Sequence, residues 1–203
     1  MGWVLSKPAR LIVVGLDNAG KSMMINQLKP SRAASYEVTP TVGLSHERFS
    51  RGGFDFTVFD MAGGGTYRSL WEKYYSGVDA IVFVVDSSDK MRMCVARDEM
   101  EMLLEHADIK GAPSAPILFF ANKMDLPGAL EPSEVSLQLG LSAITERPWQ
   151  VAASNALTGE GVNEGIEWLV STLNQKRKGG AGGGKTPSKP PPSKEAGSKT
   201  PGA

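Results

Sequence analysis

Gly15-Leu16-Asp17-Asn18-Ala19-Gly20-Lys21-Ser22 is the stretch that decides the fold of this chain. It has the spacing G-x-x-x-x-G-K-S, and it lies between an apolar run typical of a buried strand, 11–14, and a helical pattern, 23–28. A strand, a glycine-rich turn and a helix in this order direct backbone N–H groups and the positive end of the helix at one point. The stretch therefore predicts a phosphate-binding loop.

The residue types in this loop suit a chain of phosphates. Lys21 is long enough to reach the β- and γ-phosphates, and the Ser22 hydroxyl can bind Mg²⁺. The other positions are expected to surround the phosphates: Gly15, Asp17, Asn18, Ala19 and Gly20. An ordinary glycine turn before a helix is the alternative, but the spacing, the residue types and the flanks all favour the phosphate site.

A second motif, Asn122-Lys123-Met124-Asp125, follows a buried apolar run and selects the base. The Asp125 carboxylate can accept hydrogen bonds from the N1–H and 2-amino groups of guanine, a pair of donors that adenine lacks. Asn122 can brace the loop, and the stem of Lys123 can pack along the purine. A backbone N–H at Ala153 could reach the guanine O6. The sequence therefore predicts GTP or GDP as the ligand, and Asp125 argues against an adenine-nucleotide kinase.

Two further segments are placed to sense a γ-phosphate. In Pro40-Thr41-Val42-Gly43, the Thr41 hydroxyl can bind Mg²⁺ and its N–H the γ-phosphate, with a plain turn residue as the alternative. In Asp60-Met61-Ala62-Gly63, the Asp60 carboxylate can bind Mg²⁺ through water, and the Gly63 N–H can reach the γ-phosphate. Loops of this kind are ordered by a triphosphate and released after its loss. The expected metal ligands are Ser22, Thr41 and, through water, Asp60.

Strand-like and helical patterns alternate along the rest of the chain. Strands are expected at 44–50, 54–59, 80–85, 116–121 and 149–153, and helices at 67–75, 90–106, 132–139 and from Val162 to Leu173. This alternation predicts a three-layer α/β domain with a mostly parallel, six-stranded sheet. The turn at 51–53 predicts a hairpin that adds one antiparallel edge strand. Ligand loops then gather beyond the carboxyl ends of the strands.

Composition limits the class of protein. The 203 residues suffice for one domain, and no apolar run approaches the ~20 residues that span a bilayer. The single cysteine excludes an intrachain disulfide and fits a reducing, cytoplasmic setting. From Lys176 onward there are seven basic residues and one acidic residue, so this tail carries +6 and the rest of the chain −6. An acidic body is not typical of a protein that binds nucleic acid.

Three parts of the chain are expected. Residues 1–9 form a short N-terminal segment, 10–176 the nucleotide-binding domain and 177–203 a disordered basic tail that is too poor in apolar residues to fold. The opening Met1-Gly2-Trp3-Val4-Leu5-Ser6 fits the N-myristoylation pattern at Gly2, with an unmodified N-terminus as the alternative. One acyl chain binds membrane only marginally. The tail is either a solubilising segment or an electrostatic contact with anionic lipid or an acidic partner.

These motifs, in this order, resemble the Arf-like family of small GTPases over roughly residues 10–175. The phosphate loop, Pro40-Thr41-Val42-Gly43 and Leu70-Trp71-Glu72-Lys73-Tyr74-Tyr75 carry the resemblance. The segments 56–61, 116–126 and 158–161 are similar to the subfamily linked to Bardet–Biedl syndrome. The resemblance implies a switch at the cytoplasm and peripheral membrane of the cilium or its base. Its GTP form would bind membrane and recruit a BBSome-type coat for ciliary membrane-protein trafficking.

The resemblance also implies partners and an effector surface. An exchange factor and an activator would drive the switch, and the strand hairpin would shift register between states. Leu44, Phe59 and Tyr74 fall where the family places an apolar effector patch, with plain core packing as the alternative. The rival function is an activator-dependent GTP hydrolase in general vesicle or cytoskeletal trafficking unrelated to cilia.

Two features depart from the family pattern. Gly64 stands where the family usually carries a glutamine that orients the attacking water, and no arginine directly precedes Thr41. Since water positioning and an arginine finger together account for about 10⁵-fold in related GTPases, we expect very slow intrinsic GTP hydrolysis and assign no catalytic residue. The segment before the phosphate loop is also shorter than the family's usual amphipathic helix, which argues against membrane insertion there.

Overall fold

A six-stranded sheet forms the middle layer of the molecule. The computed structural model describes residues 6–29, 44–62, 64 and 71–179. Within them the strand order is β2-β3-β1-β4-β5-β6, and all neighbouring pairs are parallel except the β2–β3 hairpin. The predicted mostly parallel sheet with one antiparallel edge strand is therefore confirmed. The strands are β1 (Lys7–Val14), β2 (Leu44–Arg51), β3 (Phe54–Met61), β4 (Ala80–Asp86), β5 (Ile117–Asn122) and β6 (Trp149–Ala153).

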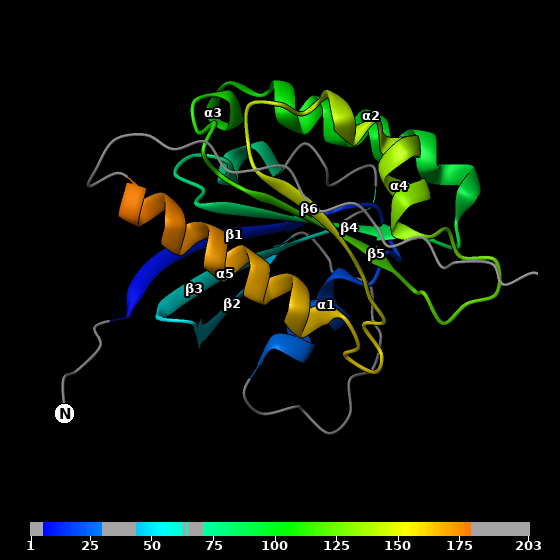
Figure 1. Ribbon diagram of the computed structural model, residues 1–203, viewed down its shortest axis with the longest axis horizontal. Helices are drawn as coiled ribbons and strands as arrows, with labels where there is room; N and C mark the ends of the chain where they lie inside the picture. The colour runs from blue at the N-terminus through cyan, green and yellow to red at the C-terminus, as the bar shows by residue number, and fades with distance from the viewer. Residues whose placement is uncertain (1–5, 30–43, 63, 65–70, 180–203) are drawn as a thin grey trace, which may run out of the picture.

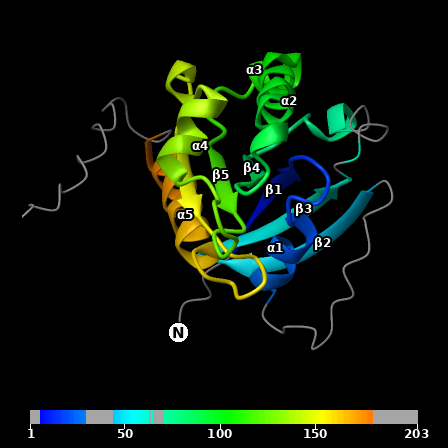
Figure 2. The same cartoon turned by 90° about the vertical axis from the view of Figure 1, so that its right-hand side faces the viewer.

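Helices cover both faces of this sheet (Figures 1 and 2). On one face lie α2 (Met93–Glu105), α3 (Ala107–Lys110) and α4 (Pro132–Leu139), and on the other lie α1 (Lys21–Leu28) and α5 (Val162–Gly179). Short 3-10 helices occur at η2 (Lys90–Arg92) and η3 (Leu141–Ala143). None of the helices in the described ranges combines the length and apolar character needed to cross a bilayer.

Strand β4 shows why the sheet takes helices on both sides. Its side chains alternate between the two layers: Ile81, Phe83 and Val85 pack into the core under α2 and α4, and Ala80, Val82 and Val84 into the core with α1 and α5. All six are buried. Because burying one large aliphatic or aromatic side chain contributes about 1.5–3 kcal/mol, both helical layers are needed to complete the core.

The first strand begins earlier than the predicted 11–14. It pairs with β3 from Lys7 onward but with β4 only from Leu11 onward. Pro8 therefore lies where β1 has one strand neighbour, so its missing N–H costs no sheet hydrogen bond on the β4 side. Residues 7–9 are therefore part of the sheet, and the expected boundary of the domain stays a prediction.

The last helix also extends beyond its predicted end. It continues to Gly179, and Arg177 donates from Nη2 to the Pro8 carbonyl at 3.1 Å and lies 4.7 Å from the Phe54 ring centroid. This cation–π contact holds the basic end of α5 against the sheet. The tail from 180 onward lies outside the described residues.

Two expected helices differ in detail. The expected helix at 90–106 is divided into η2 and α2, and Asp89 caps η2 by accepting a hydrogen bond from the Arg92 N–H. Of the expected helix at 67–75, residues 71–74 form a 3-10 turn, and 67–70 lie outside the described part of the chain.

Candidate functional site

The phosphate loop joins β1 to α1, and its two outer glycines have no room for a side chain. At Gly15, φ is 136° and a Cβ would lie 2.2 Å from the Val84 carbonyl oxygen. At Gly20, φ is 97° and a Cβ would lie 2.4 Å from Nδ2 of Asn122. Both positions require glycine, since the backbone adopts a left-handed or strained conformation against close neighbours. The predicted strand–turn–helix arrangement is present.

Lys21 and Ser22 open α1 at the foot of this loop. The Lys21 ammonium is buried and donates to the Leu16 carbonyl at 2.8 Å. The Ser22 hydroxyl donates to Oδ2 of Asp60 at 2.5 Å, and Asp60 is buried near the end of β3. Two of the three predicted Mg²⁺ ligands therefore lie in contact. Their hydroxyl and carboxylate oxygens are the hard donors that Mg²⁺ prefers, so this pair fits the ion chemically.

Asn122 ties the phosphate loop to the segment after β6. It ends β5 and is 1% exposed. Its Nδ2 donates to the Ala19 carbonyl at 2.8 Å, while its Oδ1 accepts from the Ala156 N–H at 3.0 Å and from the Ser154 hydroxyl at 3.2 Å. The brace expected at this position therefore spans three segments of the chain.

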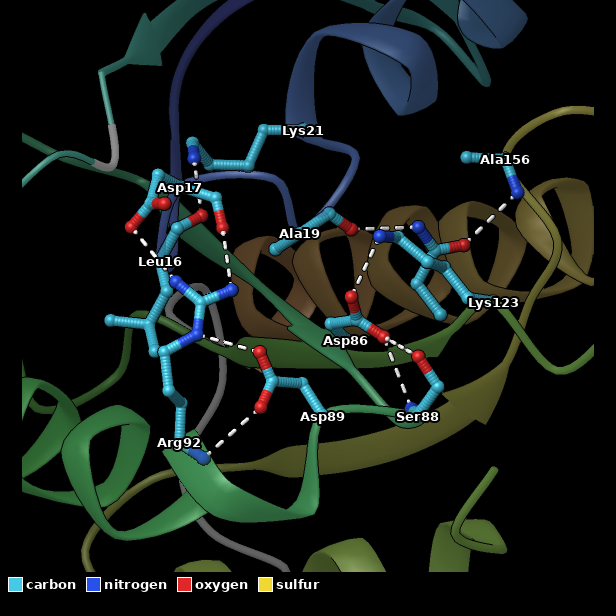
Figure 3. A network of polar contacts seen from close by, with 11 residues as sticks. Leu16, Asp17, Ala19, Lys21, Asp86, Ser88, Asp89, Arg92, Lys123 and Ala156 are labelled. Carbon is cyan, nitrogen blue, oxygen red and sulfur yellow. Dashed lines mark hydrogen bonds and ion pairs between the residues drawn. The ribbon is translucent and has the colours of Figure 1, made fainter. Parts of the chain in front are cut away.

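Lys123 is held by a carboxylate that the sequence analysis did not single out. Its backbone is left-handed, with φ at 64°, and its ammonium lies 2.6 Å from Oδ2 of Asp86 (Figure 3). Asp86 also accepts from the Ser88 N–H at 3.0 Å and from its hydroxyl at 2.6 Å. Burial alone would raise the pKa of Asp86, but the hydrogen bonds from Lys123 and Ser88 outweigh it and lower that pKa.

A second missed contact lies at the opposite end of the site. Arg92 donates from Nη1 to the Asp17 carboxylate at 3.1 Å and from Nη2 to the Asp17 carbonyl at 3.4 Å (Figure 3). Its Nε donates to the carboxylate of Asp89 at 2.6 Å. The only sequence signal for either contact was the acidic and basic composition of the segment that follows the buried run 80–85, and charge alone names no partner.

The phosphate loop and the base-selecting motif share one pocket of about 240 Å³. From the predicted site, its walls include Asn18, Gly20, Asn122, Lys123 and Asp125. Residues that sequence reasoning missed complete the lining: Met23, Leu126, Asn155, Ala156 and Leu157. Four of these have apolar side chains, and together with Asp125 they form an apolar pocket with a carboxylate in its lining, which suits a flat polar ring.

The predicted base contact at Ala153 stays a prediction, and the structure shows which residues after β6 line the pocket. Ala153 belongs to β6 and does not line the pocket, whereas Ala156 does. The chain continues past the strand end before it reaches the pocket. There, Nε2 of Gln27 on α1 donates to the carbonyls of both Ala156 and Leu157 at 2.9 Å. Spacing from the strand end could not reveal this loop, because a contact 129 residues away holds it in place.

The remaining predicted residues are partly outside the described structure. Gly2, Thr41 and Gly63 lie outside it, as does the side chain of Leu44 on β2, while Gly64 lies in a partly buried bend. The rings of Phe59 and Tyr74 lie 5.2 Å apart between centroids, and both pack partly buried against the core. The two described members of the predicted effector patch are therefore neighbours, and the patch stays a prediction.

Known proteins are similar to this chain over most of its length. The sequence matches the ADP-ribosylation factor family over residues 2–173. It is 51% identical over 174 residues to ADP-ribosylation factor-like protein 6 of Danio rerio, covering 85% of this chain and 93% of that protein. It is 40% identical over 169 residues to the protein of the same name in Caenorhabditis elegans, covering 83% of this chain and 88% of that protein.

A solved structure is similar as well. The Arl6 BBS3 small GTPase of Trypanosoma brucei, with the bound nucleotide analogue GppNp, superposes with a TM-score of 0.78 at 44% identity. The match covers 83% of this chain and 99% of that chain. This chain therefore belongs to the ADP-ribosylation factor family and has the small GTPase fold.

Proposed function

We propose that this protein is a guanine-nucleotide-dependent switch that binds GTP or GDP together with Mg²⁺. The observation that carries the proposal is the shared pocket, which Asn18 and Gly20 of the phosphate loop line together with Asp125 of the base-selecting motif. The similar Trypanosoma brucei protein was solved with GppNp, a nucleotide analogue, which supports the same ligand class here.

The proposed roles combine the sequence motifs with the contacts of the described residues. The phosphate loop, Gly15 to Gly20, and the Lys21 ammonium would hold the phosphates, and Ser22 would bind Mg²⁺ with Thr41 and, through water, Asp60. The Gly63 N–H would contact the γ-phosphate. The ion would neutralise phosphate charge, while the protein itself positions both ends of the nucleotide.

At the base, Asn122 would brace the pocket, Lys123 would cover one face of the purine, and Asp125 would pair with its N1–H and 2-amino groups. We propose that the guanine O6 is contacted from the segment at 155–157 in place of Ala153, because that segment lines the pocket.

The finer function is recruitment of an effector in the GTP form. Similarity to proteins named ADP-ribosylation factor-like protein 6 and to one titled Arl6 BBS3 supports a BBSome-type coat as that effector and ciliary membrane-protein trafficking as its setting. The protein would then act in the cytoplasm and at peripheral membrane near the cilium, with Gly2 acylation and the basic tail as membrane contacts. A pull-down that compares the GTP-loaded and GDP-loaded protein tests this, because a coat retained equally by both forms would contradict it.

The rival function is an activator-dependent GTP hydrolase in trafficking unrelated to cilia. Gly64 has no side chain to orient water, so the protein would hydrolyse GTP very slowly by itself and depend on an activator to leave the GTP state. Single-turnover GTP hydrolysis, measured with and without extract from cells that lack cilia, distinguishes the two functions. Only the rival function requires that such an extract greatly accelerate GTP hydrolysis.

Base selection tests the main proposal most directly. Replacing Asp125 with Ala removes the acceptor for the two guanine donors, so GTP affinity should fall by at least about 100-fold, with little change in the weak binding of ATP. Calorimetric titration of both nucleotides measures this. The matched control is Asp108→Ala, which removes an exposed carboxylate on α3, away from the pocket. An Asp125→Ala protein that still prefers GTP over ATP as strongly as the parent would refute the site.

A further inference from the structure

The segment between β4 and α2 contacts both halves of the candidate site. At its start, Asp86 binds Lys123 of the base-selecting motif, and at its end, Arg92 binds Asp17 of the phosphate loop (Figure 3). One short segment, 86–92, therefore reaches the two loops that grip opposite ends of the ligand. The contact of Arg92 is the less expected of the two, because its partner, Asp17, is an acidic residue in a loop that is expected to bind anions.

Arg92 is held in one orientation while it makes this contact. Its Nε donates to Oδ2 of Asp89 at 2.6 Å, which fixes the plane of the guanidinium. The two remaining nitrogens then reach the side chain and the carbonyl of Asp17, at 3.1 and 3.4 Å. A planar guanidinium that presents several fixed donors suits this arrangement better than an ammonium does.

Asp17 is the acidic residue of the stretch from Gly15 to Ser22. Its side chain is 54% exposed, so its carboxylate is a negative charge on a loop built to surround phosphates. Like charges repel in proportion to their product, so an unpaired carboxylate here would oppose a triphosphate more than a diphosphate. The Arg92 guanidinium supplies the charge that offsets it.

We propose that Arg92 is a positioning residue that neutralises Asp17 and thereby sets the preference of the site for GTP over GDP. This inference rests on the proposed function, since it concerns the same phosphate loop. It adds a residue from η2, directly before α2, to a pocket lined by α1 and by the loops that follow β1, β5 and β6.

If Arg92 had a purely structural role, replacing its side chain would lower the thermal stability of the protein. The backbone N–H of Arg92, not its side chain, completes the Asp89 cap at 3.2 Å, so the cap survives a change of side chain. The ion pair with Asp17 is partly exposed on both sides, at 35% and 54%, and exposed pairs contribute little to folding. The effect of losing Arg92 should therefore appear in the ratio of nucleotide affinities and not in thermal stability.

A double-mutant cycle tests the proposal on the full chain. Dissociation constants for GTP and GDP, with Mg²⁺, are measured for the parent, Arg92→Gln, Asp17→Asn and the double variant. Arg92→Gln should weaken GTP binding about fivefold and GDP binding by about twofold or less, a scale set by partly exposed ion pairs. In the Asp17→Asn background the same change should leave the GTP:GDP ratio nearly constant, because no carboxylate is left unpaired.

Two controls accompany the cycle. Arg97→Gln removes an arginine of α2 whose partner, Glu101, lies on the same helix at 2.7 Å, and it should leave both affinities unchanged. Arg92→Lys keeps the positive charge and should retain most of the GTP:GDP ratio even where the fork geometry is lost.

The outcomes separate the two proposals. Equal weakening of GTP and GDP by Arg92→Gln, or the same change of ratio with Asp17→Asn present, overturns the role of Arg92 while the nucleotide switch stands. A parent protein that binds neither nucleotide overturns the switch itself, and that result is seen before any variant is made. If the Arg92→Gln protein fails to fold, the GTP:GDP affinity ratios of Arg92→Lys and Asp17→Asn are compared with that of the parent instead.

Discussion

The two ends of the pocket are built in different ways. The phosphate end is one continuous stretch of chain whose backbone conformation forms the site. Gly15 and Gly20 are required there because neighbouring atoms leave no space for a Cβ. The base end is assembled from distant segments, and side chains hold it: Asn122 from β5 and Gln27 from α1 both bind the loop at 156–157.

This difference indicates which kind of substitution should disrupt each end of the pocket. A backbone-built loop fails when a side chain intrudes on it, whereas an assembled loop fails when a buried hydrogen-bonding group is removed. A side chain added at Gly15 or Gly20 should therefore abolish tight binding, and changes at the base end should be graded by how many contacts are lost.

The largest effect is expected at Gly20. In Gly20→Ala, the added methyl would overlap Nδ2 of Asn122 at a positive φ, so the loop must shift and the bond from Asn122 to Ala19 breaks. We expect GTP affinity to fall by more than about 100-fold and the free energy of unfolding by about 2–3 kcal/mol. Titration calorimetry and thermal unfolding measure the two quantities.

Gly53 provides the matched control for this change. It also has a positive φ, 81°, but a Cβ there would meet nothing within 4 Å. Gly53→Ala should therefore cost only backbone strain, about 1 kcal/mol, and leave GTP binding unchanged. If the two alanine variants bound GTP equally well, close packing around Gly20 would not explain the loop.

An intermediate effect is expected from Asp86→Asn. It removes the charge that holds the Lys123 ammonium, and since that pair is mostly buried, we expect nucleotide affinity to fall roughly tenfold. Dissociation rates of a fluorescent guanine nucleotide measure the change. A retained rate would mean that Lys123 is positioned by its left-handed backbone alone.

The same pair gives a pH dependence. The pKa of Asp86 is lowered in the folded protein from its ordinary 3.8. Its contribution is therefore fully present above that ordinary value and is lost only as the pH falls through the lower, folded-state pKa. The effect of Asp86→Asn on dissociation should thus be constant between about pH 5 and pH 8, because a carboxylate with this pKa is ionised throughout that range. An effect that vanished near pH 6 would contradict this assignment.

The smallest effect is expected at Gln27. Gln27→Ala removes two donors from the carbonyls of Ala156 and Leu157, so the base loop loosens and nucleotide dissociation should accelerate about fivefold. Gln27→Lys restores a donor at the same reach and should recover most of the parent rate. If the alanine and lysine variants dissociated equally fast, hydrogen bonding from α1 would not position this loop.

Most of the fold could be predicted because its signals are local. The strand at 149–153 and the helix at 132–139 have the bounds that periodicity predicted. The hairpin is present as expected, with Gly52-Gly53 as its turn, because Arg51 still pairs with Phe54. Two of the differences lie at the start of β1 and at the end of α5. The start of β1 and the end of α5 are fixed by contact with each other, through Arg177 and Pro8, and no local pattern announces such a contact.

By itself, the sequence determined the phosphate loop and the base-selecting motif, because each is a short run whose residue types and spacing suit one chemistry. Only the tertiary structure decided what positions them: Asp86 beside Lys123, Arg92 beside Asp17 and Gln27 beside the loop at 156–157. These partners lie far apart along the chain, 75 residues for Arg92 and Asp17 and 129 for Gln27 and Ala156. The physical reason is that a motif needs only neighbouring residues, whereas a brace needs the sheet to bring distant strand ends together.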